Sequence, residues 1–100
     1  MDDRSVAAVA HALGNPARVR ILRLLAAQES CMGGEVFHAL PLAQSTISQH
    51  LGVLKRAGLV RATRQGTRML YCITDEPLAG LRGLLDTLIE QHPVCTGEEH

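Results

Sequence analysis

The chain has 100 residues, of which 46% are hydrophobic and only one Tyr and one Phe are aromatic, and its ten Lys and Arg residues balance ten Asp and Glu residues. This length favours one small domain with an aliphatic core, and association with a second copy would cover further apolar surface. The sequence has no apolar run of about 18 residues and no basic start followed by an apolar stretch, so we expect neither a membrane span nor a secretory signal.

The three cysteines, Cys31, Cys72 and Cys95, are widely spaced and odd in number. They make a poor disulfide framework and favour a reducing, cytoplasmic environment. No Cys-x-x-Cys, His-Glu-x-x-His, glycine-rich phosphate loop or Gly-x-Ser-x-Gly motif occurs, and the five histidines are scattered. We therefore expect neither an enzyme nor an organic cofactor.

The first third of the chain predicts three helical segments. Residues 4–13 carry the apolar residues Val6, Val9, Ala10 and Leu13 at helical spacing. Gly14-Asn15-Pro16 then ends one helix and caps the next, which covers residues 16–27 and turns Val19, Leu22 and Leu25 or Ala26 to one face. Residues 28–33 predict a loop or a short strand, and residues 34–39 predict a brief helix.

The rest of the chain predicts a longer helix, a hairpin and a final helix. Ile47, Leu51 and Leu54 form a buried stripe on a helix over residues 44–57, which Gly58 closes. Residues 59–64 and 67–74 alternate as two strands joined by a turn at Gln65-Gly66. The last helix, over residues 76–91, has a leucine-rich stripe, so residues 1–92 form the domain and residues 93–100 a loose tail.

Charge is strongly polarised along this neutral chain. Residues 36–74 contain no acidic residue and five basic ones, Lys55, Arg56, Arg61, Arg64 and Arg68. A local excess of positive charge on one compact unit is what binding to a phosphate backbone requires. A solvated basic face with no partner is the alternative interpretation.

Together these elements predict a mainly α fold with a small β-hairpin, in the order α-α-α-α-β-β-α. A short helix, a four-residue turn and a longer helix with a polar face make a helix-turn-helix, and the hairpin is its wing.

Two motifs add a family resemblance that covers about residues 6–90. Residues 12–22 read ALGNPARVRIL, and residues 45–51 and 54–60 read STISQHL and LKRAGLV. In order and spacing these resemble the ArsR/SmtB family of bacterial metal- and stress-sensing repressors. The resemblance implies a winged helix-turn-helix homodimer that pairs through its first and last helices. It also implies that an inducer releases the repressor from double-stranded operator DNA.

The polar face of the 44–57 helix and the wing are the candidate DNA-binding surface. Amide and hydroxyl groups on the first half of such a helix reach base edges in the major groove, and Gln49 is the first candidate because its amide pairs with adenine. The basic residues suit phosphates, which position the protein without specifying sequence. For His50, packing on the helix surface is the favoured alternative. The candidates are Gln44, Ser45, Thr46, Ser48, Gln49, His50, Lys55, Arg56, Arg64 and Arg68.

The sequence lacks the two metal-site patterns that many family members use to bind an inducer. The Cys-x-Cys pair found in many family members is replaced here by Met32 and Gly34, and Asp86, Glu90 and His92 on the last helix lack the family's Asp-x-His pair. Pairing of the segment before the third helix with the second wing strand would bring Cys31 near Cys72, and Cys95 could reach them from the tail.

Three interpretations of the cysteines stay open. Three thiolates suit As(III), Sb(III) or another thiophilic ion. A reversible Cys31–Cys72 disulfide that responds to oxidants or sulfur species is the second interpretation, and small buried residues with no sensory role are the third. Outside this class, a winged-helix module that binds only proteins is a further alternative.

Overall fold

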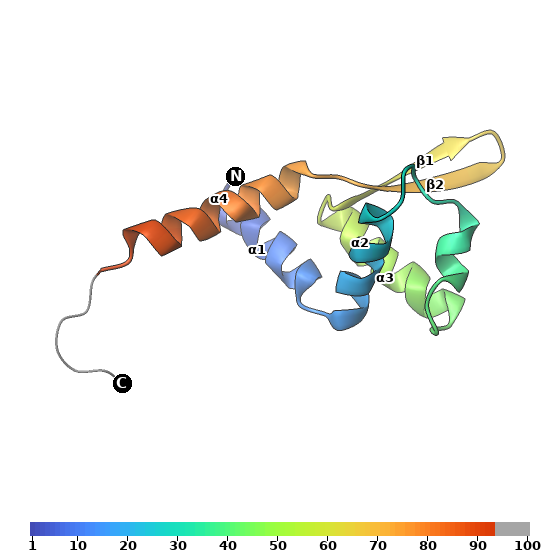
Figure 1. Cartoon of the computed structure of the whole chain (residues 1–100), viewed down its shortest axis with the longest axis horizontal. Helices are drawn as coiled ribbons and strands as arrows, with labels where there is room; N and C mark the ends of the chain where they lie inside the picture. Colours follow the sequence, from blue (N-terminus) through green and yellow to red (C-terminus); the bar gives the residue numbers. More distant parts are fainter. Residues whose placement is uncertain (94–100) are drawn as a thin grey trace.

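The computed structural model describes residues 1–93 and consists of four helices, one short 3-10 helix and one hairpin (Figure 1). The elements are α1 (Asp3–Leu13), α2 (Pro16–Ala26), η1 (Gly34–His38), α3 (Gln44–Arg56), β1 (Val60–Gln65), β2 (Arg68–Ile73) and α4 (Glu76–Gln91). The mainly α fold with a hairpin wing is confirmed. One predicted α-helix is instead the 3-10 helix η1, because five residues close only the tighter i to i+3 turns.

The helix boundaries follow from capping groups that are visible in the sequence. The Asn15 side chain accepts hydrogen bonds from the backbone N–H groups of Ala17 (2.9 Å) and Arg18 (3.3 Å), and Pro16 occupies the first turn of α2, as predicted. Asp2 caps α1 by accepting from the Ser5 N–H at 2.8 Å, and this bond lowers the pKa of the Asp2 carboxyl. Gly58, with φ of 78°, ends α3 in the left-handed conformation that glycine tolerates.

The core lies where α1, α2 and α3 meet the base of the wing. The stripe predicted on α3 is confirmed, since Ile47, Leu51 and Leu54 are all buried. Two details differ from the predicted stripes of the first two helices. Ala12 rather than Ala10 is buried in α1, and Ile21 is buried in α2, where Val19 is only half-buried and Ala26 is exposed. Both differences arise because α1 packs against both α2 and α4, and α2 against both α3 and β2, so each helix is covered over a wider arc than one stripe.

The wing is an antiparallel hairpin with one additional backbone bridge. Gln65 pairs with Arg68, so the turn residues are Gly66 and Thr67, one position later than predicted. Gly66 has a φ of 65°, which explains the glycine at this site. On the edge of β2 that faces away from β1, Tyr71 exchanges two backbone hydrogen bonds with Met32, at 3.0 and 2.7 Å. Residues 28–33, predicted as a loop or a short strand, are therefore a loop with a single bridge to β2.

The last helix, α4, leaves much of its apolar surface uncovered. It lies beside α1 and then extends away from the body of the domain (Figure 1). Leu78 and Leu81 pack against the core, but further along Leu85, Leu88 and Ile89 are 49%, 57% and 65% exposed. In the described residues, no helix combines the length and apolar character needed to cross a membrane.

Candidate nucleic-acid interface and cysteine pair

The exposed side of α3 carries most of the predicted base-reading residues. Ser45, Gln49 and Arg56 follow one another at helical spacing on the side opposite the buried stripe. Gln44, Ser48 and Lys55 are also exposed, whereas Thr46 is half-buried at the flank. The polar face predicted from the sequence is therefore on the exposed side of α3.

His50 is not a free surface residue, because it contacts Arg18 of α2. One guanidinium nitrogen of Arg18, Nη1, lies 3.4 Å from His50 Nδ1. Since a guanidinium only donates, Nδ1 is the acceptor, and in the neutral ring Nε2 then carries the proton. The predicted packing role of His50 thus has a specific partner in α2.

The same Arg18 side chain also ties α2 to the end of α1. Its Nε donates to the Ala12 carbonyl at 2.7 Å, and its Nη2 donates to the His11 carbonyl at 3.3 Å. Both carbonyls belong to the last turn of α1, where carbonyl groups run out of N–H partners within the helix. The His11 carbonyl also accepts from the N–H of the capping residue Gly14, at 3.0 Å. Arg18 therefore links the end of α1 to α3. In the sequence Arg18 is part of the ALGNPARVRIL motif, and nothing in that pattern indicates its partners.

The basic residues of the wing differ in what surrounds them. Arg64 is exposed near the turn, and within residues 1–93 no carboxylate pairs with it. Arg68 lies 3.7 Å from the carboxylate of Glu35 in η1, and both side chains remain more than half exposed. A surface ion pair of this kind is weak, so Arg68 can exchange Glu35 for a phosphate.

Glu35 was not predicted as part of this surface, since it lies one residue before the acid-free segment. Its carboxylate accepts from the Gly33 N–H at 3.0 Å. Hydrogen bonds from the backbone N–H groups of Glu35 and Gly33, and the nearby Arg68 charge, hold the pKa of Glu35 below its ordinary value. The carboxylate is therefore ionised at neutral pH, and it places one negative charge near the turn of an otherwise basic wing.

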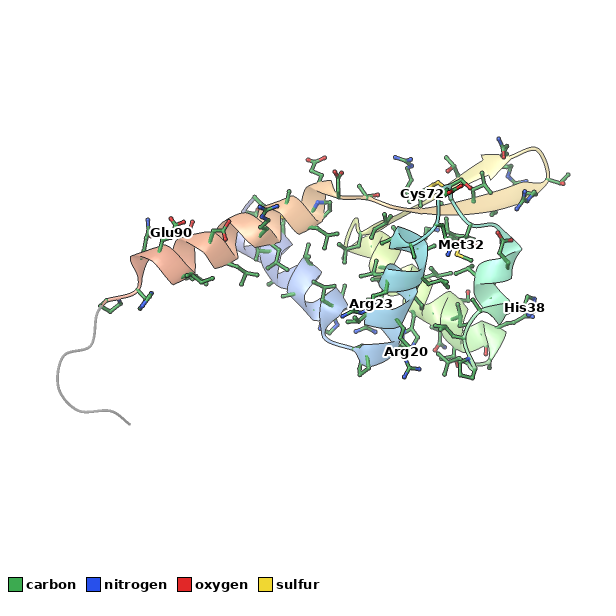
Figure 2. The ribbon with its side chains drawn as sticks, viewed as in Figure 1. Arg20, Arg23, Met32, His38, Cys72 and Glu90 are labelled. Atoms are coloured by element: carbon green, nitrogen blue, oxygen red, sulfur yellow. A yellow bond between two sulfur atoms is a disulfide. The ribbon has the colours of Figure 1, made fainter. Side chains whose placement is uncertain are left out.

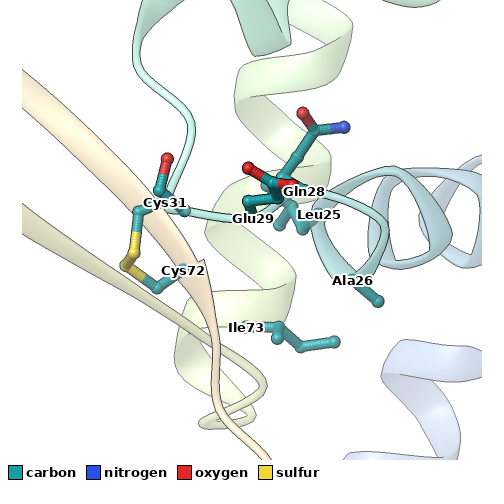
Figure 3. A pocket seen from close by; sticks show the side chains of 8 residues that line it. Leu25, Ala26, Gln28, Glu29, Cys31, Cys72 and Ile73 are labelled. Carbon is teal, nitrogen blue, oxygen red and sulfur yellow. A yellow bond between two sulfur atoms is a disulfide. The ribbon is translucent and has the colours of Figure 1, made fainter.

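Two of the three cysteines meet where η1 adjoins the wing. Cys31 and Cys72 form a disulfide with a Cα–Cα distance of 4.7 Å, although 41 positions separate them in the sequence (Figures 2 and 3). The expectation of a poor disulfide framework is therefore wrong for this pair, because the Met32–Tyr71 bridge aligns the two residues next to it. Cys95 lies outside the described residues.

A cavity of about 220 Å³ opens beside the disulfide (Figure 3). Apolar side chains from the end of α2 and from β2 line part of it, and the loop that leads to Cys31 supplies polar groups. Its lining residues are Leu25, Ala26, Gln28, Glu29, Ser30, Cys31, Cys72 and Ile73. Both cysteines thus line a space large enough for a small molecule.

A complete metal site is not formed by residues 1–93, where no three His, Cys, Asp or Glu side chains are grouped to hold an ion. Asp86, Glu90 and His92 are all exposed at the far end of α4, so the structure does not bring them together with the cysteines. Any third ligand for Cys31 and Cys72 must come from Cys95, from solvent or from another chain.

Comparison with known proteins places this architecture among bacterial regulators. The profile of the family described as bacterial regulatory protein, arsR family, matches residues 15–62, which include α2, η1 and α3. An uncharacterised HTH-type transcriptional regulator of Methanocaldococcus jannaschii is 40% identical over 77 residues, a region that covers 77% of this chain and 86% of that protein.

Two solved structures extend the similarity. One is the homodimeric winged helix-turn-helix DNA-binding domain of a possible ArsR-family regulator from Mycobacterium bovis. It is 35% identical, with a TM-score of 0.65, over 100% of this chain and 97% of that one. The other is a possible transcriptional regulator for arsenical resistance. It is 35% identical, with a TM-score of 0.66, and covers 78% of this chain and 80% of that one.

Proposed function

The chain belongs to the ArsR family of transcriptional regulators, and on that premise we propose that it is a homodimeric repressor released from operator DNA by a thiophilic inducer. The observation that carries the proposal is the position of the Cys31–Cys72 pair, which joins the segment leading into the helix-turn-helix to the second strand of the wing. A ligand or a redox change at that pair therefore acts where the wing is joined to the segment before the helix-turn-helix.

Operator binding is supported by the joint surface of α3 and the wing. Gln49 and its polar neighbours on α3 are exposed amide and hydroxyl groups, the kinds that read base edges, and Lys55, Arg56 and Arg64 are exposed cations suited to phosphates. Residues 36–74 contribute no carboxylate to this surface, and Glu35 adds one beside Arg68, near the turn of the wing. A winged helix that binds only proteins has no need of such a charge distribution.

Dimerisation is supported by the apolar stripe that α4 leaves uncovered. Leu85, Leu88 and Ile89 would remain exposed to water in a monomer, which is unfavourable for a domain with so small a core. The homodimeric relative from M. bovis has the same fold over the whole chain. We therefore assign this stripe, with the adjoining part of α1, to the contact between two copies.

The inducer we propose first is As(III) or Sb(III). In the reduced protein, Cys31 and Cys72 are two soft donors already held side by side, and such thiolates favour thiophilic ions. Arsenious acid exchanges each hydroxide for a thiolate and releases one water per cysteine. Cys95 is the proposed third ligand, since residues 1–93 supply only two.

A second candidate inducer is an oxidant or a sulfur species, and the Cys31–Cys72 disulfide favours it. Two thiols lose two protons and two electrons to a peroxide or to another disulfide as the bond forms. Cys95 has no part in this reaction. The two candidate inducers therefore differ in whether release from DNA requires Cys95.

The experiment is fluorescence anisotropy of the reduced protein on the DNA upstream of its own gene, at several salt concentrations. Tight binding that weakens with salt establishes the repressor, whereas binding that is insensitive to salt contradicts it. Arsenite and, separately, hydrogen peroxide are then titrated into the complex formed by the wild type and by the variants C31S, C72S and C95S. Release by arsenite that all three variants lose supports the metalloid, whereas release by peroxide that survives in C95S supports the redox switch. If both agents leave every complex intact, the cysteine pair is not the inducer site.

A further inference from the structure

A glycine sits in the middle of the DNA-reading side of α3. Gly52 lies between Gln49 and Arg56, which occupy the same exposed side one turn before and one turn after it. The face that carries polar side chains at its other positions therefore has no side chain of its own at this point, where the backbone is half-exposed and the Arg56 guanidinium lies over it.

The fold itself does not require glycine at this position. In the described chain only Gly58 and Gly66 have positive φ, so Gly52 has an ordinary helical backbone. A Cβ atom placed on Gly52 would lie 3.5 Å from Nη1 and 3.9 Å from Nη2 of the Arg56 guanidinium. Apart from the backbone of α3 itself and the two adjacent residues, no other heavy atom would lie within 4 Å of it. These are ordinary contact distances to the mobile end of a long side chain. Alanine would fit, and glycine inside a helix is less stable than alanine.

We propose that Gly52 is the point of closest approach between α3 and the operator, and that its missing side chain determines how deeply α3 enters the major groove. This inference rests on the proposed operator binding. Glycine is the residue that permits close approach of a backbone to a ligand. With no side chain at position 52, the DNA contacts the helix backbone directly, Gln49 reaches base edges, and Arg56 reaches a phosphate. A methyl group at position 52 holds α3 away from the groove floor, and Gln49 loses its short contacts first.

The test uses G52A together with G83A as a matched control. Gly83 is an exposed glycine inside α4, and a Cβ atom placed there meets no heavy atom within 4 Å. Both variants receive the same methyl group within a helix, so each is expected to raise Tm by about 4 °C or more. Only G52A is expected to weaken operator binding, by about tenfold, with a smaller loss on random DNA because loose electrostatic complexes need no close approach.

The opposed directions of the two measurements make the result decisive. A G52A protein that is more stable and binds the operator as tightly as the wild type and G83A would overturn the proposal. A G52A protein that is less stable than the wild type would overturn it too, because the fold would then require the glycine. Failure of the wild type itself to bind the operator would instead refute the proposed repressor, and it is seen before either variant is measured.

Discussion

Substitution of Leu88 by alanine should separate the two copies of the proposed dimer. The Leu88 side chain is 57% exposed in the single chain. Complete burial of a leucine contributes about 1.5–3 kcal/mol, so burying this exposed part contributes about 0.9–1.7 kcal/mol. A symmetric dimer contains the contact twice, and alanine keeps the Cβ atom, so L88A should weaken dimerisation by about 2 kcal/mol. The dimer Kd should therefore rise about 30-fold.

Sedimentation equilibrium across a range of protein concentrations measures this change directly. Leu42, in the turn before α3, is 37% exposed and lies outside α1 and α4, so L42A serves as the matched control with an unchanged dimer Kd. Circular dichroism should show that both variants keep their helices, because neither side chain belongs to the buried core. An L88A protein that dimerises as tightly as L42A would refute the assignment of the α4 stripe to the dimer contact.

Three further predictions concern the links between elements. Reduction of the Cys31–Cys72 disulfide, which closes a loop over a separation of 41 residues, should lower the free energy of unfolding by up to about 4 kcal/mol in urea denaturation, and an unchanged midpoint would contradict the bond. R18A should weaken operator binding, and R18K should recover only part of the loss, because lysine cannot bond both the α1 carbonyls and His50. Equal affinity of R18A and the wild type would rule out this positioning role. E35Q should free Arg68 for a phosphate, raise affinity a few-fold and make the log–log salt slope steeper by up to about 0.9, and a slope equal to that of the wild type would show that Glu35 does not compete. Because the pKa of Glu35 is lowered, the wild-type competition should persist from neutral pH down through the usual glutamate range and end only when the carboxyl protonates below it.

The elements that the sequence predicted best are those with local signals at both ends. The helix α4 was predicted over residues 76–91 and has those bounds, because Pro77 fits its first turn and Pro93 cannot continue it. The α2 start was equally clear from Asn15 and Pro16. Capping groups act on backbone atoms within three residues, so a single sequence contains the whole interaction.

Contacts between distant residues were much harder to predict. Arg18 and His50 are 32 positions apart, and neither residue type specifies the other as its partner. Glu35 fell one residue outside the acid-free segment, although the fold places it beside Arg68. The Cys31–Cys72 contact was anticipated only because winged helices in general pair this segment with the second wing strand. Burial was hard to predict for the same reason. Ile21 is buried by contacts with other elements, and the helical spacing of apolar residues within α2 does not reveal those contacts.

The position of the cysteine pair suggests which part of DNA binding an inducer changes. Residues 31–35 contact β2 at three points, which are the Cys31–Cys72 bond, the Met32–Tyr71 bridge and the weaker Glu35–Arg68 ion pair. The Arg18 bonds, in contrast, fix α3 against α1 and α2 at a separate site. An inducer releases DNA only if it binds the DNA-free arrangement better than the DNA-bound one, and the arrangement nearest to the sulfur atoms is that of the wing. We therefore expect the reduced, oxidised and arsenite-treated proteins to differ mainly in their phosphate contacts, and hence in the slope of affinity against salt, while the base preference set by α3 stays the same.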